Sequence, residues 1–331
     1  MDSYDRMHSL TTLAVILLAT VTDVLSSSDS SDFYNQTCPQ APTIVQNTVH
    51  DIMQKNKGIA AGVLQLQFHD CIITGCDGSI LLSSPDNTSE KDALKSSLRG
   101  FTEIDQIKSA VEAECPGVVS CADILALAAR DGVVEVAGKG WFVTLGRKDG
   151  MESNNSDVPL VHPGAFMSYD ELVDTFAAKG FTAEEMITLS GAHTLGRAVC
   201  GLPPIQIRYY QYNGTIGSVD PSIDPNFARS VKQMCPMDTK SRVPVPLDLT
   251  NTTFDNKYYQ AVLANQGVLK SDASLITNPD GRKLVTRYSQ SDSDFQRDFG
   301  AVMEKLINQR WAKDGEIRRS WSAMNTDSIS L

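Results

Sequence analysis

The stretch LQLQFHDCIITGCDGSI, from Leu64 to Ile80, places a histidine, two aspartates and two cysteines close together at the end of a helical pattern. Oxygen-bearing side chains follow the histidine, and glycines allow a tight backbone there. The oxygen-bearing residues are Asp70, Asp77, Ser79 and, further along, Glu90. Ca²⁺ takes ~6–8 oxygen ligands of these kinds, so the residue types predict a calcium-binding loop. The spacing is not that of an EF-hand, and an ordinary acidic turn is the alternative.

Cysteines enclose this loop and are frequent in the chain, which has seven in 331 residues. A disulfide between Cys71 and Cys76 would form a small ring that fixes the loop. Disulfides persist in oxidising compartments, so the cysteine content favours an exported protein. A tetrahedral zinc site is not expected, because the sequence contains no HExxH motif and no CxxC pair.

The N-terminal residues also indicate export. Arg6 and His8 precede an apolar run, Leu10 to Leu25, and small residues follow it. This pattern predicts a cleaved signal peptide over residues 1–28 rather than a membrane anchor, leaving one domain over residues 29–331. Asn-x-Ser/Thr sequons fit a secreted glycoprotein; they begin at Asn35, Asn87, Asn154, Asn213 and Asn251. The formal net charge of −11 argues against nucleic acid or an anionic membrane as a partner.

Helix signals dominate the rest of the chain. Three pairs have capping-box spacing: Ser120 with Asp123, Ser168 with Glu171, and Thr182 with Glu185. An apolar face that begins at Phe295 predicts a long helix ending near Gly315. GWFVTLGR, residues 140–147, is the best strand candidate. The sequence therefore predicts a mostly α protein with very little β structure.

Each of the five histidines can be weighed separately. His8 lies in the leader, and His50 lies on an amphipathic helix where a solvent-facing histidine is the simpler interpretation. His162 lies in a proline-flanked loop, and the sequence assigns it no function. His69 and His193 each lie at a helix end among glycine, cysteine and hydroxyl residues, so these two are the candidates for chemistry.

Five motifs then occur in one order along the chain. They are FHDCIITGCDGSILL (68–82), RGFTEIDQIKSAVEAECPGVVSCADILALAARD (99–131), LGRKD (145–149), LSGAHTLGRAVC (189–200) and FDNKYY (254–259). This order resembles that of the secretory plant haem peroxidases, the class III family, from Phe33 to about Asn325. The resemblance implies a two-lobed helical bundle with haem b between the lobes, held non-covalently because no CxxCH motif is present.

The resemblance also implies the roles of single residues. His193 would be the proximal iron ligand and Asp272 its carboxylate partner, while His69 would be the distal acid and base. Pro159 would line the exposed haem edge where donors react. The expected reaction is reduction of hydrogen peroxide and one-electron oxidation of small phenolic donors. The family habit is a monomer that is secreted to the cell wall, with the vacuole as the alternative destination.

Two calcium sites are implied in the same way. The distal ligands would be Asp70, Ile73, Gly75, Asp77 and Ser79, with Glu90 binding through water. The proximal ligands would be Thr194, Asp248, Thr253 and Asp255, with either Thr250 or Asn251 in the middle. That choice stays open because DLTNTTFD is one residue shorter than the usual spacing.

The disulfides implied are Cys38–Cys115, Cys71–Cys76 and Cys200–Cys235. The fourth bridge of the family would join Cys121 to a cysteine after GEIR, but Trp321 stands at that position. Cys121 is therefore expected to be a free, buried and inert thiol. Loss of a long-range bridge costs roughly 2–5 kcal/mol, so a lower stability than that of four-bridge relatives is expected.

Two further departures affect the distal pocket. Gln65 stands four residues before His69, where the family has an arginine, and a neutral amide cannot replace its charge. EKDALKSSLRGF lacks the usual asparagine that binds the distal histidine, and only Ser96 or Ser97 could substitute. Removing one charge-stabilising donor typically costs ~10²–10³ in rate.

Three hypotheses follow from the sequence. The first is a slowed haem peroxidase. The second is a secreted haem and calcium glycoprotein with vestigial peroxidase activity and a binding or other redox role. The third is a helical glycoprotein without haem, which the pair His193 and Asp272 argues against.

Overall fold

The computed structural model describes residues 32–309 and 314–325; the expected signal peptide lies outside these residues. The α-helices are α1 (Ala41–Lys55), α2 (Ile59–Ile73), α3 (Glu90–Leu94), α4 (Phe101–Glu114), α5 (Cys121–Glu135), α6 (Val158–Val161), α7 (Tyr169–Ala177), α8 (Ala183–Ser190), α9 (Pro203–Tyr210), α10 (Pro225–Met234), α11 (Lys257–Leu263), α12 (Lys270–Ser274), α13 (Pro279–Gln290) and α14 (Asp292–Ile307). The 3₁₀ turns are η1 (Asp32–Tyr34), η2 (Ser79–Leu81), η3 (Gly191–Thr194) and η4 (Tyr212–Gly214), and the strands are β1 (Arg197–Val199) and β2 (Pro244–Pro246). The mostly α fold predicted from the sequence is confirmed.

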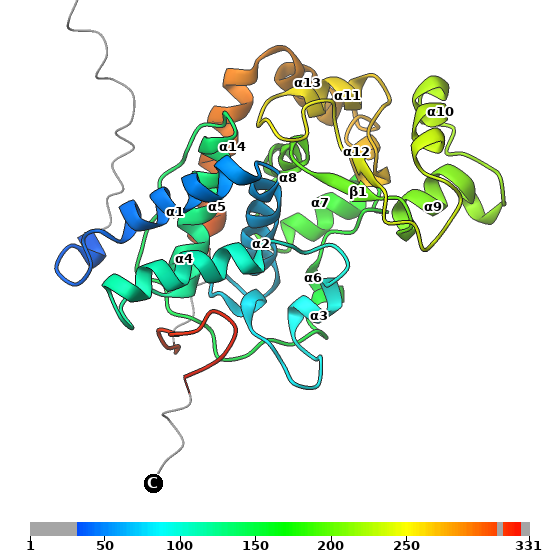
Figure 1. Ribbon diagram of the computed structural model, residues 1–331. Coiled ribbons are helices and arrows are strands. Elements are labelled where there is room, and N and C mark those ends of the chain that lie inside the picture. Colours follow the sequence, from blue (N-terminus) through cyan, green and yellow to red (C-terminus); the bar gives the residue numbers. More distant parts are fainter. Residues whose placement is uncertain (1–31, 310–313, 326–331) are drawn as a thin grey trace, which may run out of the picture.

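The helices form two groups that share one hydrophobic core. Helices α1, α2, α4 and α5 pack on one another, and α8, α11, α13 and α14 form the second group. Helix α14 contacts both α2 and α8 and so joins the groups. A smaller core lies under α9 and α10, which stand at the opposite side of the molecule from α1 (Figure 1).

Local capping explains where several helices begin. The reciprocal capping boxes of Ser168 with Glu171 and of Thr182 with Glu185 open α7 and α8. Ser120 caps α5 by accepting from the backbone N–H of Asp123, but the Asp123 side chain does not return the bond. Its carboxylate instead pairs with Arg147 at 2.8 Å and accepts from the Tyr34 hydroxyl, so tertiary partners replace the local one.

The sequence prediction is wrong at two places. Residues 140–147 form no strand, although residues 141–147 alternate between buried and half-buried as a strand would. An extended segment needs a neighbouring strand to pair with, and the ladder that does form joins β1 to β2 in antiparallel register, with Ala198 opposite Val245. Helix α14 ends at Ile307 rather than near Gly315.

The structure contains the three bridges Cys38–Cys115, Cys71–Cys76 and Cys200–Cys235, and it leaves Cys121 free and buried. Over the described residues, no helix combines the length and apolarity needed to cross a membrane.

Candidate active site

His69 lies near the C-terminal end of α2 with its side chain facing the interior. Only 6% of its surface is exposed, and its buried Nδ1 has no hydrogen-bond partner among the residues that the structure describes. Burial, with a smaller contribution from the neighbouring His162, lowers the pKa of His69 to about 3. The imidazole is therefore neutral at physiological pH and can accept a proton.

Neither Gln65 nor the two candidate serines forms a hydrogen bond with His69 among the described residues. Gln65 lies one turn earlier on α2, on the same helical face, and is half-buried. Within the described chain its amide makes no hydrogen bond. Ser96 and Ser97 are exposed, and the Ser97 hydroxyl donates to the Leu94 carbonyl at 3.0 Å. Neither serine replaces the missing asparagine.

His162 instead lies against His69, which sequence reasoning missed. The two ring centroids are 4.8 Å apart and the rings are inclined by 71°, an edge-to-face arrangement. His162 is the C-terminal cap of α6, the helix that also contains the exposed Pro159. Burial lowers the pKa of His162. No local signal predicts this contact, because it joins residues far apart in sequence.

His193 lies on η3, directly after α8, and is held by a buried carboxylate. Its Nδ1 is 2.8 Å from Oδ1 of Asp272, which is 2% exposed. Asp272 also accepts from the Tyr258 hydroxyl at 2.9 Å and from the Leu269 N–H at 2.9 Å. Desolvation alone would lower the pKa of His193, but the Asp272 carboxylate raises it overall. Tyr258 is a further residue that the sequence did not single out.

The loop after α2 gathers the oxygen atoms predicted for the distal cation site. Asp70 is buried and accepts from the backbone N–H of Gly78 at 2.9 Å, while the Ser79 hydroxyl donates to Glu90 at 3.2 Å. Thr74, which the sequence did not indicate, donates to Glu90 at 3.1 Å. Burial, with the Asp77 charge nearby, raises the pKa of Glu90 to about 8.

The predicted backbone ligands of this loop are already partly engaged. The Gly75 carbonyl accepts from the backbone N–H of Asp77 at 2.8 Å. The Ile73 carbonyl accepts from Nζ of Lys179 at 3.0 Å, which places a lysine beside the loop. A carbonyl oxygen has two lone pairs, so these bonds leave one acceptor position on each atom.

A second oxygen cluster lies beside His193. The Thr194 hydroxyl donates to Asp248 at 2.7 Å and lies 3.3 Å from Asp255. The Thr250 hydroxyl donates to Asp255 at 3.0 Å, whereas the backbone carbonyl of Asn251 accepts from Gly196. Burial raises the pKa of Asp248 to about 6. The geometry thus brings Thr250, rather than the Asn251 side chain, to the carboxylates.

Thr253 is tied to this cluster through the backbone, since its N–H donates to the Thr250 carbonyl at 2.7 Å. Over residues 32–309 and 314–325, no three histidine, cysteine, aspartate or glutamate side chains gather as a metal centre. A cation at either cluster would therefore need hydroxyl and carbonyl oxygens as well as carboxylates.

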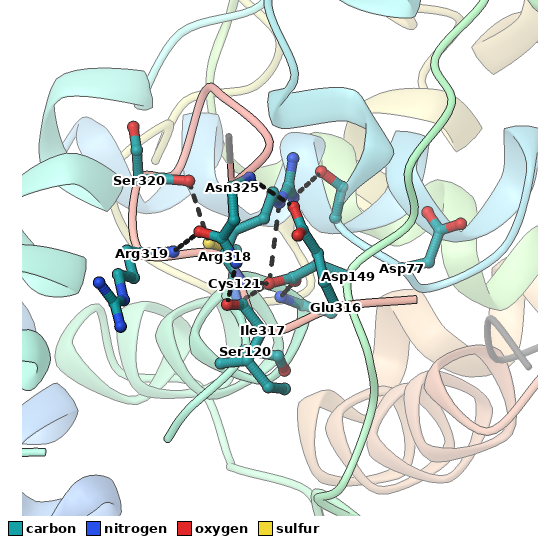
Figure 2. Close-up of polar contacts among 12 residues, drawn as sticks. Asp77, Ser120, Cys121, Asp149, Glu316, Ile317, Arg318, Arg319, Ser320 and Asn325 are labelled. Atoms are coloured by element: carbon teal, nitrogen blue, oxygen red, sulfur yellow. Dashed lines mark hydrogen bonds and ion pairs between the residues drawn. The ribbon is translucent and has the colours of Figure 1, made fainter. Parts of the chain in front are cut away.

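Polar contacts hold the C-terminal segment where the fourth bridge is missing (Figure 2). The carboxylate of Asp149 accepts from the N–H groups of Cys121, Ala122 and Arg318, at 2.9–3.1 Å. Nη2 of Arg318 donates to the carbonyl of Gly78 at 2.5 Å, so this network reaches the oxygen-rich loop. We refer to Asp149 and Arg318 as the clamp.

Cys121 lies beside the clamp, with its Sγ 4.0 Å from the Ser320 carbonyl oxygen. Trp321 follows, and its ring stacks on Phe101 at 5.7 Å. Burial, with the Asp149 charge adding to it, raises the pKa of the Cys121 thiol to about 12. The thiol is thus protonated and enclosed, in the manner of an inert structural cysteine.

Known proteins are similar in sequence to this chain over most of its length. The family profile described as Peroxidase matches residues 45–291. Peroxidase 39 of Arabidopsis thaliana is 36% identical over 324 residues, covering 95% of this chain and 98% of that protein. Peroxidase N1 of Nicotiana tabacum is 39% identical over 331 residues, covering 96% and 98%. The chain belongs to the class III plant peroxidase family.

Further relatives agree with this assignment. The basic peroxidase of Zinnia elegans is 41% identical over 278 residues, covering 84% of each chain. As a member of the family, the protein is an oxidoreductase that acts on hydrogen peroxide. Peroxidases of this family generally depend on haem and bind calcium.

Proposed function

We propose that the protein is a secreted haem peroxidase that reduces hydrogen peroxide slowly and oxidises small phenolic donors by one-electron steps. The observation that carries the proposal is the 2.8 Å contact between Nδ1 of His193 and Asp272. This contact fixes the ring and makes it a stronger electron donor, as carboxylates do for metal-bound histidines. We assign haem b to this chain on that basis, with His193 as the iron ligand.

The surroundings of His193 fit such a ligand. Its Nδ1 is engaged by Asp272, which leaves Nε2 for a metal, and 40% of the side chain is exposed although the carboxylate behind it is buried. A histidine that served only the hydrophobic core would be covered on both sides. When bound, haem supplies the iron that gives up two electrons to peroxide and regains them one at a time from donors.

The distal residues of the chain then determine the rate. His69, neutral and buried, takes the proton from one oxygen of peroxide and delivers it to the other oxygen, which leaves as water. Gln65 can donate a hydrogen bond to that oxygen but brings no positive charge. Removing one charge-stabilising donor from an active site typically lowers the rate by ~10²–10³, and we expect a reduction of that size in the rate of O–O cleavage.

The alternative of a vestigial peroxidase has an observation of its own. Nδ1 of His69 is buried without a partner among the described residues, so the imidazole lacks the hydrogen bond that would define its tautomer. A glycoprotein that holds haem and calcium, with a binding or other redox role, would have the same sequence features. The rate of reaction with peroxide separates the two.

We also assign two Ca²⁺ ions to the oxygen clusters. The distal ion would use the carboxylates of Asp70 and Asp77, the Ser79 hydroxyl and the carbonyls of Ile73 and Gly75, with Glu90 acting through water. The proximal ion would use Thr194, Asp248, Thr250, Thr253 and Asp255. The raised pKa values of the buried acids support this, because a bound cation would offset the cost of burying their charges.

The remaining assignments follow the family and the leader. We infer a signal peptide over residues 1–28 and a single peroxidase domain over residues 29–331, secreted as a monomer to the cell wall or vacuole. Four of the five sequon asparagines are exposed and open to glycosylation: Asn35, Asn87, Asn154 and Asn213. Phenolic donors would approach at Pro159, which is exposed on α6.

The test is to express the protein through a secretory pathway with haem available and to record its absorption spectrum. A haem band in the wild type, with peroxide-dependent oxidation of a simple phenol, is the expected result. His193→Ala should lose both. His50→Ala is the matched control, because His50 is an exposed histidine paired with Glu135. A haem band that survives unchanged in His193→Ala would contradict the assignment.

A further inference from the structure

Two observations at the distal histidine lead beyond the proposed function. Nδ1 of His69, which family members hold with an asparagine, is buried without a partner in the described chain. The ring of His162 packs edge to face on the ring of His69, with the centroids 4.8 Å apart. We propose that His162 is a positioning residue, whose ring contact fixes the imidazole of His69 in place of that missing hydrogen bond. This inference rests on the proposed function.

The chain holds His162 firmly enough for that role. Its backbone N–H donates to the carbonyl of Val158 at 3.0 Å and closes α6, and Pro163 restricts the backbone that follows. Helix α6 packs on α2, the helix that contains His69. Beyond Pro163, the Met167 N–H donates to the carbonyl of Gly164 at 3.1 Å, which forms a tight turn.

The same loop is anchored at the other side of the site. The backbone N–H of Ser271 donates to the carbonyl of Ala165 at 3.1 Å. Ser271 directly precedes Asp272, the partner of His193. The loop that contains His162 is therefore attached both to α2, near the distal histidine, and to α12, near the proximal one. A ring attached in this way can hold its neighbour in one orientation.

The size of the effect follows from the type of contact. Edge-to-face ring pairs are weak interactions, equivalent to roughly a two- to tenfold bias between arrangements. Removing the ring should therefore cost about two- to tenfold in any step that needs one orientation of His69, which is smaller than the cost assigned to Gln65. A polar role for His162 would depend on its nitrogen atoms, whereas ring positioning would not.

Three variants separate these possibilities. His162→Ala removes the ring, His162→Leu removes the ring but keeps most of the volume, and His162→Phe keeps a ring without nitrogen atoms. The measurement is the rate at which cyanide binds to the ferric haem protein, because hydrogen cyanide must give its proton to a base such as His69. Proton NMR of the cyanide complex reports the orientation of the His69 ring independently of any activity.

The ring contact predicts that the alanine and leucine variants bind cyanide about two- to tenfold more slowly, with shifted or broadened His69 resonances. The phenylalanine variant should stay within about twofold of the wild type. Unchanged haem spectra and thermal midpoints establish that the variants are folded, and His50→Ala is the control for loss of a histidine.

Two results would overturn the inference: cyanide binding that is unaffected in both the alanine and the leucine variant, or a phenylalanine variant as slow as those two. Absence of a haem band in the wild type would overturn the proposed function, and this inference with it. A normal haem band with insensitive cyanide binding would overturn this inference alone.

Discussion

Asp149→Asn should destabilise the protein severely, because the clamp joins the C-terminal segment to the start of α5, where no fourth bridge is present. Asp149 and Arg318 are both fully buried, and Nε of Arg318 lies 3.7 Å from Oδ2 of Asp149. The carboxylate also accepts three backbone N–H bonds, two of them from the first turn of α5. An asparagine has nearly the same shape but no charge, and its amide presents hydrogen atoms where acceptors are needed.

The magnitude can be worked from these contacts. Hydrogen bonds to a charged group contribute about 1.5–3 kcal/mol and neutral ones about 0.5–1.5, so three weakened bonds cost about 3 kcal/mol. Breaking a buried ion pair by removing one charge costs about 3–5 kcal/mol. The two costs are not added, because the same loss of charge weakens the hydrogen bonds and breaks the ion pair. We therefore expect the free energy of unfolding to fall by about 3–5 kcal/mol.

Two assays test this expectation. Denaturant unfolding, followed by circular dichroism, gives the change in free energy at constant slope. Labelling with a thiol reagent reports opening at the clamp, since Cys121 is the one cysteine of the seven that is not in a disulfide. If the segment opens locally, labelling of Cys121 should become about 10²- to 10⁴-fold faster, as 1.4 kcal/mol is a factor of ten.

Asp294→Asn is the matched control, since Asp294 pairs with Arg297 on the exposed face of α14 at 2.7 Å. Exposed pairs contribute about 0–1 kcal/mol, so this change should be nearly silent. A loss below 1 kcal/mol for Asp149→Asn, with Cys121 labelled no faster than in the wild type, would show that the clamp does not hold the C-terminal segment.

Three more predictions concern the cations, the proximal histidine and alkaline pH. Calcium chelation should lower the thermal midpoint by several degrees, because two clusters of buried acids lose their counter-ions, and added Ca²⁺ but not Mg²⁺ should restore it. Asp272→Asn should raise the ferric/ferrous potential by roughly 60 mV or more, measured by redox titration, since His193 becomes a weaker donor; an unchanged potential would contradict this. The raised pKa of Cys121 means that the folded state keeps a proton that the unfolded state releases above pH ~9. Stability should therefore fall with rising pH there, by up to ~1.4 kcal/mol per pH unit, and Cys121→Ala should show a shallower fall; equal slopes would argue against a buried thiol.

Local patterns explain why much of the fold could be predicted. Capping pairs such as Ser168 with Glu171 act within one turn, so the sequence alone locates the start of α7. Residues 140–147 could not be predicted in this way, because a strand depends on a neighbouring strand from any other part of the chain. The partner of the Asp123 side chain could not be predicted either, because Arg147 reaches it only through tertiary folding.

Some site residues could be predicted from the sequence, and others could be found only in the structure. His69 and His193 stand in the quoted motifs, and the family resemblance implies Asp272 as the partner of His193. His162, Thr74 and Tyr258 were not singled out, because each gains its significance from a contact with a predicted site residue. Such contacts form only when distant helices and loops pack together, and a single sequence contains no signal for them.

We propose that Gln65 limits the reaction of this peroxidase with hydrogen peroxide. Its most direct test is stopped-flow mixing of the ferric protein with peroxide, following the haem absorbance in the wild type and in Gln65→Arg. We expect arginine to raise the rate by ~10² or more, because it restores a charge beside the leaving oxygen. A wild type that reacts nearly as fast as Gln65→Arg would contradict it.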